Sequence, residues 1–86
     1  MEFPAFEWYW RGRVLRFTRH IREELDRERK NIEFVTEILE NGEHRLESKR
    51  ENKVEAILCI GKWEWNVSYV EHEDSIILIH LGKKRR

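Results

Sequence analysis

The chain has 86 residues, enough for one domain with one modest core. Hydrophobic residues make up 40% of it and aromatic residues 12%, a composition that argues against intrinsic disorder. Its 17 basic and 17 acidic side chains cancel, which excludes the whole-chain positive charge common among nucleic-acid-binding proteins.

The first segment of the chain alternates between exposed and apolar positions. Trp8 and Trp10 share one side, Arg11-Gly12 is expected to turn the chain, and residues 13–17 are again extended. Thr18 is then predicted to be an N-cap, because its hydroxyl can accept a hydrogen bond from an amide of the first helical turn.

A helical pattern follows over residues 19–30, with Ile21 and Leu25 on its buried stripe. Asn31 can cap a second helical segment that ends near Asn41, and Gly42 is suited to the left-handed position just past a helix. The pattern fits either two helices or one kinked helix. The second segment buries one face, made of Ile32, Val35, Ile38 and Leu39.

After Gly42 the period changes from 3.6 to 2, which predicts strands over about 43–50, 54–60, 63–70 and 75–81. The last of these is apolar on both faces and is therefore expected at the centre of the sheet. Helices grouped before strands predict an α+β fold, with two N-terminal helices packed on a roughly four-stranded antiparallel β-sheet. We expect one domain over residues 1–86, with about 1–5 and 83–86 flexible.

Two short segments hold more than half of the positive charge. Residues 11–22 contain five arginines, one histidine and no acid, and residues 83–86 are all basic. If the two segments meet, they form a patch that can hold an RNA phosphate backbone. Alternatively, the arginines pair with Glu23, Glu24 and Asp26 on a solvated surface. The predicted nucleic-acid-binding residues are Arg11, Arg13, Arg16, Arg19, Arg22, Lys83 and Lys84.

Three residues are candidates for acid–base chemistry. His20 lies just after the predicted helix start and His80 alternates with the apolar residues of the last strand. Cleavage of RNA without a metal needs one group that takes a proton and one that gives it, roles that suit His20 as acceptor and His80 or Tyr69 as donor. The alternatives are an exposed first-turn histidine, an edge-facing histidine and a core tyrosine.

We expect neither a metal nor another cofactor. His44 and His72 fall in predicted turns beside glutamates and are interpreted as surface residues. The four histidines show no His-x-His spacing, and the lone Cys59 excludes a cysteine-based zinc cluster and an intrachain disulfide.

The expected compartment is a reducing cytoplasm. A lone cysteine suits it, the N-terminus has no signal-peptide layout, and no apolar run approaches the roughly 18–20 residues of a membrane span. Glutamine is absent while Glu, Arg and Lys abound, which hints at a thermophile.

The string Phe17-Thr18-Arg19-His20, followed by a charged helix and then by the run that ends at Gly42, resembles the small domains related to the BrnT and RelE toxins. The resemblance spans about residues 13–82. It implies an α+β fold, metal-independent ribonuclease activity and an antitoxin-like protein partner. His20 stands at the family histidine, whereas Glu24 and Glu28 stand where the family has arginines.

The sequence therefore predicts a metal-independent endoribonuclease of toxin–antitoxin type. The alternative is a non-catalytic module that binds RNA or a protein partner, including a second copy in a homodimer. The neutral charge favours this alternative, because toxins of this type are usually basic. A stand-alone domain built for stability in a hot cytoplasm is the third interpretation.

Overall fold

The computed structural model describes residues 7–86 and shows an α+β fold, which confirms the predicted class. Two helices accompany a six-stranded mixed sheet with the strand order β1-β2-β6-β5-β4-β3. Residues 1–5, expected to be flexible, lie outside the described residues. The helices are α1 (Arg19–Glu28) and α2 (Ile32–Asn41), and the strands are β1 (Tyr9–Trp10), β2 (Arg13–Phe17), β3 (Glu43–Ser48), β4 (Lys53–Ile60), β5 (Trp63–Glu71) and β6 (Ser75–Arg85).

The sheet differs from the expected four-stranded antiparallel one. Strands β1 and β2 precede the helices, and β2 pairs in parallel with β6, from Val14 opposite Ser75 to Phe17 opposite Leu78. The helices are thus inserted between strands and are not strictly N-terminal. Local alternation marks 13–17 as extended, but it carries no information on a partner strand about 60 residues later. The central position predicted for the last strand is confirmed, since β6 lies between β2 and β5.

Side-chain caps define both helices at the predicted residues. The Thr18 hydroxyl accepts from the Ile21 N–H, and the Asn31 side chain accepts from the Phe34 N–H at 3.0 Å. Helix α1 ends because Arg29 adopts the left-handed conformation, with φ of 55°. The chain therefore forms two separate helices.

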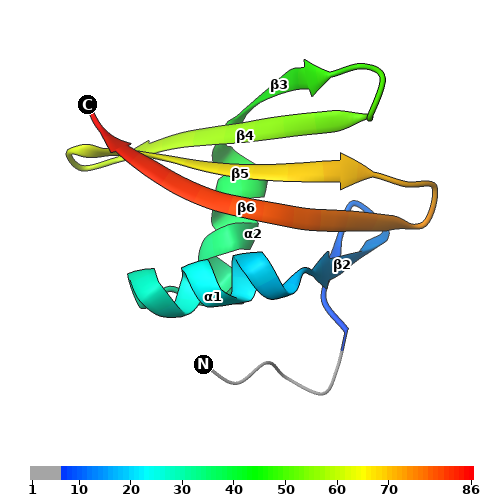
Figure 1. Cartoon of the computed structure of the whole chain (residues 1–86), viewed down its shortest axis with the longest axis horizontal. Helices are drawn as coiled ribbons and strands as arrows, with labels where there is room; N and C mark the ends of the chain where they lie inside the picture. Colours follow the sequence, from blue (N-terminus) through cyan, green and yellow to red (C-terminus); the bar gives the residue numbers. More distant parts are fainter. Residues whose placement is uncertain (1–6) are drawn as a thin grey trace.

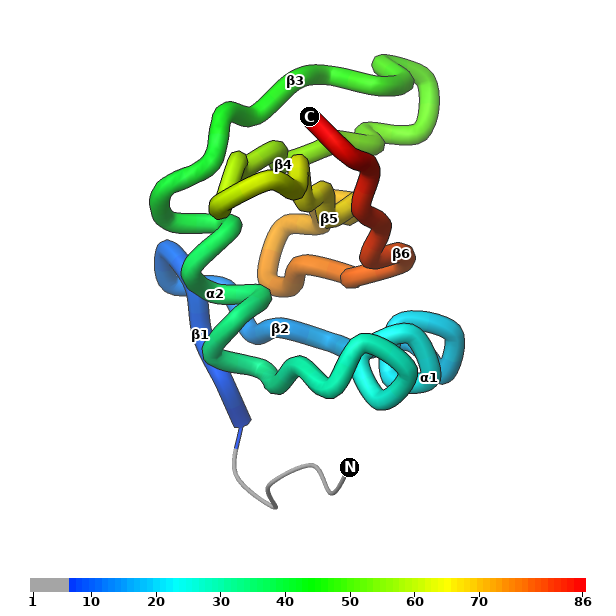
Figure 2. Tube along the Cα trace, turned by 90° about the vertical axis from the view of Figure 1, so that its left-hand side faces the viewer, coloured from blue at the N-terminus to red at the C-terminus, as the bar shows by residue number. Residues whose placement is uncertain are grey.

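The helices cover one face of the sheet and one edge of β6. Helix α2 crosses behind β4 and β5, and α1 runs alongside β6 (Figures 1 and 2). The opposite face, which we call the outer face, carries no helix of the described chain. No helix within residues 7–86 is long and apolar enough to cross a membrane. The core contains the predicted helix stripes and the predicted strand face, including Ile21, Leu25, Val35, Ile38, Leu39, Trp65, Val67 and Tyr69.

Gly42 does not adopt the predicted left-handed conformation. Its φ of −80° and ψ of 165° are extended. A Cβ at this position would lie 2.5 Å from the Ile38 carbonyl oxygen and 2.8 Å from that of Ile57. Glycine is therefore needed because the end of α2 approaches the backbone of β4 too closely for a side chain.

We expect Gly42→Ala to lower the free energy of unfolding by about 2 kcal/mol or more, because backbone atoms must move to make room. Gly12→Asn is the control, since Gly12 has open space around it and a φ of 75° that asparagine tolerates. Urea denaturation measures both. Equal midpoints for Gly42→Ala and the unchanged protein would contradict the close approach.

Candidate active site

Strand β6 continues past the end of β2, and α1 takes the place of a neighbouring strand there. Strand β2 ends at Phe17, level with Leu78. The Thr18 hydroxyl donates to the Leu78 carbonyl at 2.9 Å, and three residues further the Leu81 N–H donates to Glu24 Oε1, also at 2.9 Å. Glu24 is only 6% exposed. A buried carboxylate thus accepts a hydrogen bond from a backbone N–H of β6 beyond the point where β2 ends.

Two histidines converge on the same carboxylate. His80 Nδ1 lies 2.7 Å from Glu24 Oε2, and His20 Nε2 lies 3.5 Å from Glu24 Oε1. The imidazole rings face each other, with centroids 5.7 Å apart and planes within 15°. His20 and Glu24 share a helix face because they are four residues apart. The structure therefore brings together two predicted catalytic residues that are 60 positions apart in the sequence.

A β-bulge places His80 on the outer face. Ser68 pairs with His80 and Tyr69 with Leu78, so Ile79 is an extra residue in β6. Without this insertion His80 would share the core face with Leu78. With it, Leu81 enters the core and His80 points to the open side, where its side chain is 46% exposed.

Gly82 and Asn66 complete the surroundings of His80. The two residues are paired across β5 and β6. A Cβ on Gly82 would lie 3.0 Å from His80 Nε2 and 3.1 Å from Asn66 Oδ1. The missing side chain of Gly82 therefore leaves His80 Nε2 and the Asn66 amide side by side at the surface of the sheet.

Three residues of this site, Glu24, Asn66 and Gly82, were not predicted from the sequence. The four-residue spacing of His20 and Glu24 was a readable signal, because it places a carboxylate beside a histidine on one helix face. The sequence gives no such signal for Asn66 and Gly82, because their position beside His80 depends on the pairing of β5 with β6.

The predicted nucleic-acid-binding residues near the N-terminus are divided between two places. Arg13 pairs with Glu71 at 3.4 Å, and the Arg11 guanidinium stacks on the Trp10 ring at 4.4 Å, both at the β1–β2 turn. Arg19 pairs with Glu23 at 3.1 Å, as the alternative interpretation expected. Arg22 is exposed on α1. Arg16 points to the outer face level with Ile77 and forms no ion pair within residues 7–86.

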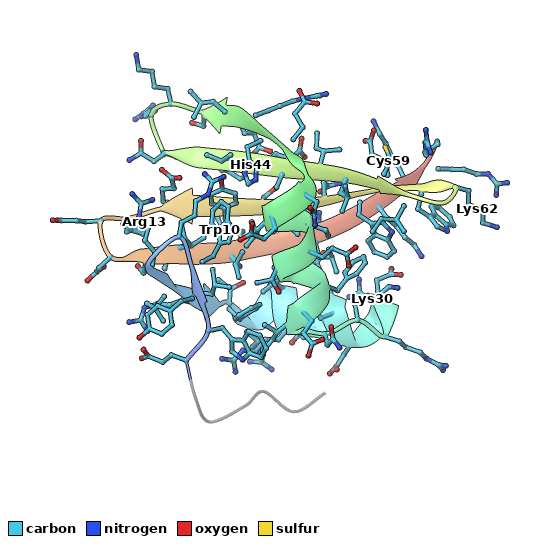
Figure 3. The ribbon with its side chains drawn as sticks, turned by 180° about the vertical axis from the view of Figure 1, so that it is seen from behind. Trp10, Arg13, Lys30, His44, Cys59 and Lys62 are labelled. Carbon is cyan, nitrogen blue, oxygen red and sulfur yellow. The ribbon has the colours of Figure 1, made fainter. Side chains whose placement is uncertain are left out.

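The C-terminal basic residues lie in β6, with Lys83 bound to Glu28 at 2.7 Å and Lys84 to Glu64 at 3.3 Å. Lys83 is eight residues from Ser75, which at about 3.3 Å per residue is roughly 26 Å along the strand. Figure 3 shows Arg13 and Lys62 at opposite ends of the sheet, and the Arg86 N–H donates to the Lys62 carbonyl at 2.9 Å. The β1–β2 turn and the end of β6 therefore do not form one continuous patch. Arg16 on β2, and Arg19 and Arg22 on α1, lie between these two places.

Tyr69, the third predicted catalytic residue, lies away from this site on the core face and is 2% exposed. Its hydroxyl is 2.7 Å from His44 Nδ1, and His44 Nε2 is 2.7 Å from the Leu39 carbonyl. A carbonyl only accepts, so neutral His44 carries its proton on Nε2 and accepts the Tyr69 O–H at Nδ1. The hydroxyl proton of Tyr69 is therefore committed to His44 and is not offered to a substrate.

His44 itself is not the surface residue that the sequence analysis expected. It is half-buried, and its ring stacks on Trp10 with centroids 5.3 Å apart. Figure 3 shows both residues on the helix-bearing side of the sheet. The turn pattern around His44 could not reveal this, because Trp10 and Tyr69 reach it from distant strands.

No family model, curated protein or solved structure matches this chain.

Burial raises the pKa of Tyr69 to about 12 from 10.0. The folded state thus keeps the phenol proton at a pH where the unfolded chain has lost it, so stability is complete below pH 10 and falls between pH 10 and 12. Between pH 10 and 12 we expect the free energy of unfolding of Tyr69→Phe to fall by about 2 kcal/mol less than that of the unchanged protein. Near pH 7 the same substitution lowers the free energy of unfolding by about 1 kcal/mol, because a hydrogen bond is lost. Chemical denaturation at several pH values measures it. Parallel pH profiles for the protein and Tyr69→Phe would contradict the expectation.

Proposed function

We propose that the His20–Glu24–His80 site cleaves RNA by acid–base catalysis without a metal ion. The observation that carries the proposal is a pair of exposed imidazoles held by one buried carboxylate. His20 takes the proton of a ribose 2′-hydroxyl, and the freed oxygen attacks the adjacent phosphorus. His80 gives a proton to the leaving 5′-oxygen as the P–O5′ bond breaks. The products are a 2′,3′-cyclic phosphate and a 5′-hydroxyl.

The contacts of Glu24 favour this division of roles. Its Oε2 atom is 2.7 Å from His80 Nδ1, the position from which a carboxylate fixes a ring and stabilises positive charge on it. This leaves His80 Nε2 for the proton that is donated. His20 is further from the carboxylate, at 3.5 Å, and is 62% exposed, which suits a group that must accept a proton from substrate.

Neighbouring side chains supply binding for the phosphate. Arg16 on β2 and Arg19 in the first turn of α1 lie on the elements that flank His20. The Asn66 amide lies beside His80 and can donate to a phosphate oxygen. The proposal thus uses groups from β2, α1, β5 and β6.

We expect the purified protein to cleave a structured RNA in EDTA, and His20→Ala and His80→Ala each to lower the rate about 10²–10⁴-fold. Glu24 keeps its hydrogen bond from the Leu81 N–H in both variants, and circular dichroism verifies that each remains folded. His72→Ala, which removes an exposed histidine from the β5–β6 turn, is the control.

Identification of the cyclic phosphate end tests the chemistry directly. Cleavage that persists in both histidine variants, or that needs an added divalent ion, would overturn the proposed mechanism.

The competing function is RNA binding without cleavage. Four of the candidate basic residues already pair with acidic side chains, namely Arg13, Arg19, Lys83 and Lys84, and the net charge of the chain is zero. The electrostatic attraction for RNA is therefore modest. Glu24 and Glu28 also occupy the two positions where the toxin-like pattern carries arginines. In this interpretation the outer face next to α1 holds the phosphate backbone, and the histidines make contacts only.

RNA binding through this face should weaken at least about tenfold between 50 and 200 mM salt, as expected for a few phosphate contacts. Arg16→Ala should lower the affinity and flatten the salt dependence, because it removes a contact. Lys62→Ala, at the distant β4–β5 turn, should leave both unchanged. Fluorescence anisotropy with a labelled RNA measures the affinities, and a flat salt response would exclude a phosphate-based interaction.

A further inference from the structure

We infer that His20, Glu24 and His80 also bind a divalent transition-metal ion of the Zn²⁺ type, and that the bound ion blocks the acid–base site. The binding stands on the geometry of the three side chains alone, whereas the block rests on the proposed function. The sequence predicts no metal site, because its four histidines show no His-x-His spacing and its single cysteine excludes a cysteine-based cluster.

The donor atoms are already near the spacing that an ion requires. Each residue offers one ligand atom, and these atoms all lie within 4.8 Å of one another. Ligands at about 2.0–2.2 Å from a tetrahedral ion are roughly 3.4 Å apart. His80 Nδ1 lies 2.7 Å from Glu24 Oε2 and His20 Nε2 lies 3.5 Å from the other oxygen, Oε1, so each imidazole already has a carboxylate oxygen near this spacing. Small rotations of the exposed rings therefore complete the site.

The carboxylate is held as ligating carboxylates usually are. Glu24 is buried, and its Oε1 atom accepts the Leu81 N–H at 2.9 Å. Such second hydrogen bonds orient metal ligands and support their affinity. The edge of β6 thus fixes one ligand, and an arriving ion needs to order only His20 and His80.

The chemistry of the donors selects the class of ion. Two imidazoles and one carboxylate match the three-ligand sets of Zn²⁺ sites that keep an open position. Imidazole nitrogen favours Zn²⁺, Co²⁺ or Ni²⁺ over Mg²⁺ and Ca²⁺, which prefer oxygen. Both histidines face solvent, so an ion can enter and its remaining positions can hold water.

Ligation and acid–base catalysis exclude each other at these residues. An ion on His20 Nε2 occupies that nitrogen and forces the ring proton onto Nδ1. Neither ring nitrogen of His20 can then accept a proton. An ion on His80 Nδ1 replaces the proton that is shared with Glu24, and the imidazolium form is lost. One bound ion therefore disables both the acceptor and the donor.

The binding test is a titration of the metal-free protein with Co²⁺, followed by visible absorption, and with Zn²⁺, followed by calorimetry. We expect one ion per chain. His80→Ala and Glu24→Gln should each weaken binding at least about tenfold, whereas His72→Ala should not change it. Glu24→Gln keeps an oxygen for the Leu81 N–H, so it tests the ligand with the fold retained. The absence of binding, or binding that is unaffected by His80→Ala, would overturn the inference.

RNA cleavage in EDTA and in excess Zn²⁺ separates this inference from the proposed function. Cleavage in EDTA that Zn²⁺ suppresses supports both. A protein that binds the ion but never cleaves RNA refutes the proposed function and leaves the metal site standing. Cleavage in EDTA by a protein that binds no ion refutes the metal site alone. Cleavage that Zn²⁺ activates refutes the block.

Discussion

The carboxylate of Glu24 closes the stretch of β6 that no strand covers, and the candidate site follows from this contact. A buried carboxylate is costly unless its oxygens are hydrogen-bonded, and here they meet the Leu81 N–H and two imidazoles. Because α1 begins directly after β2, its first turns must lie along this edge. Ile21 and Leu25 then face the core, and the adjacent stripe of the same helix carries His20 and Glu24. One contact thus serves both the fold and the site.

The β-bulge at Ile79 divides β6 into a first half that fills the core and a second half that carries His80 on the outer face. Before it, Ile76 and Leu78 fill the core; after it, the alternation is reversed, so that Leu81 is buried and His80 is exposed. The bulge also places two histidine clusters on different sides of the sheet. His44 and Tyr69 form a closed hydrogen-bonded chain on the helix-bearing side. His20, Glu24 and His80 leave nitrogen atoms open at the margin of the outer face.

The parts of this structure that sequence predicts well depend on neighbours within about four residues. Thr18 and Asn31 cap their helices, and Ile21 and Leu25 pack inward, because capping and helical spacing are local properties. The parallel pairing of β2 with β6 is not local, and the bulge at Ile79 has no glycine or other marker residue. His20 and His80 could therefore be named as candidates from the sequence. Their approach, and the role of Glu24 between them, depended on pairings that no local pattern encodes.

Charge balance constrains how such a site can attract a polyanion. The exposed pair of Arg19 with Glu23 contributes about 0–1 kcal/mol, as surface ion pairs do, so an RNA phosphate can replace Glu23 at little cost. The contacts of Glu24 cannot be exchanged in this way, because its carboxylate is buried and holds the edge of β6. In the proposed RNA complex a phosphate therefore recruits Arg19 without disturbing the carboxylate that contacts both histidines. Zero net charge limits long-range attraction, but it leaves this local exchange intact.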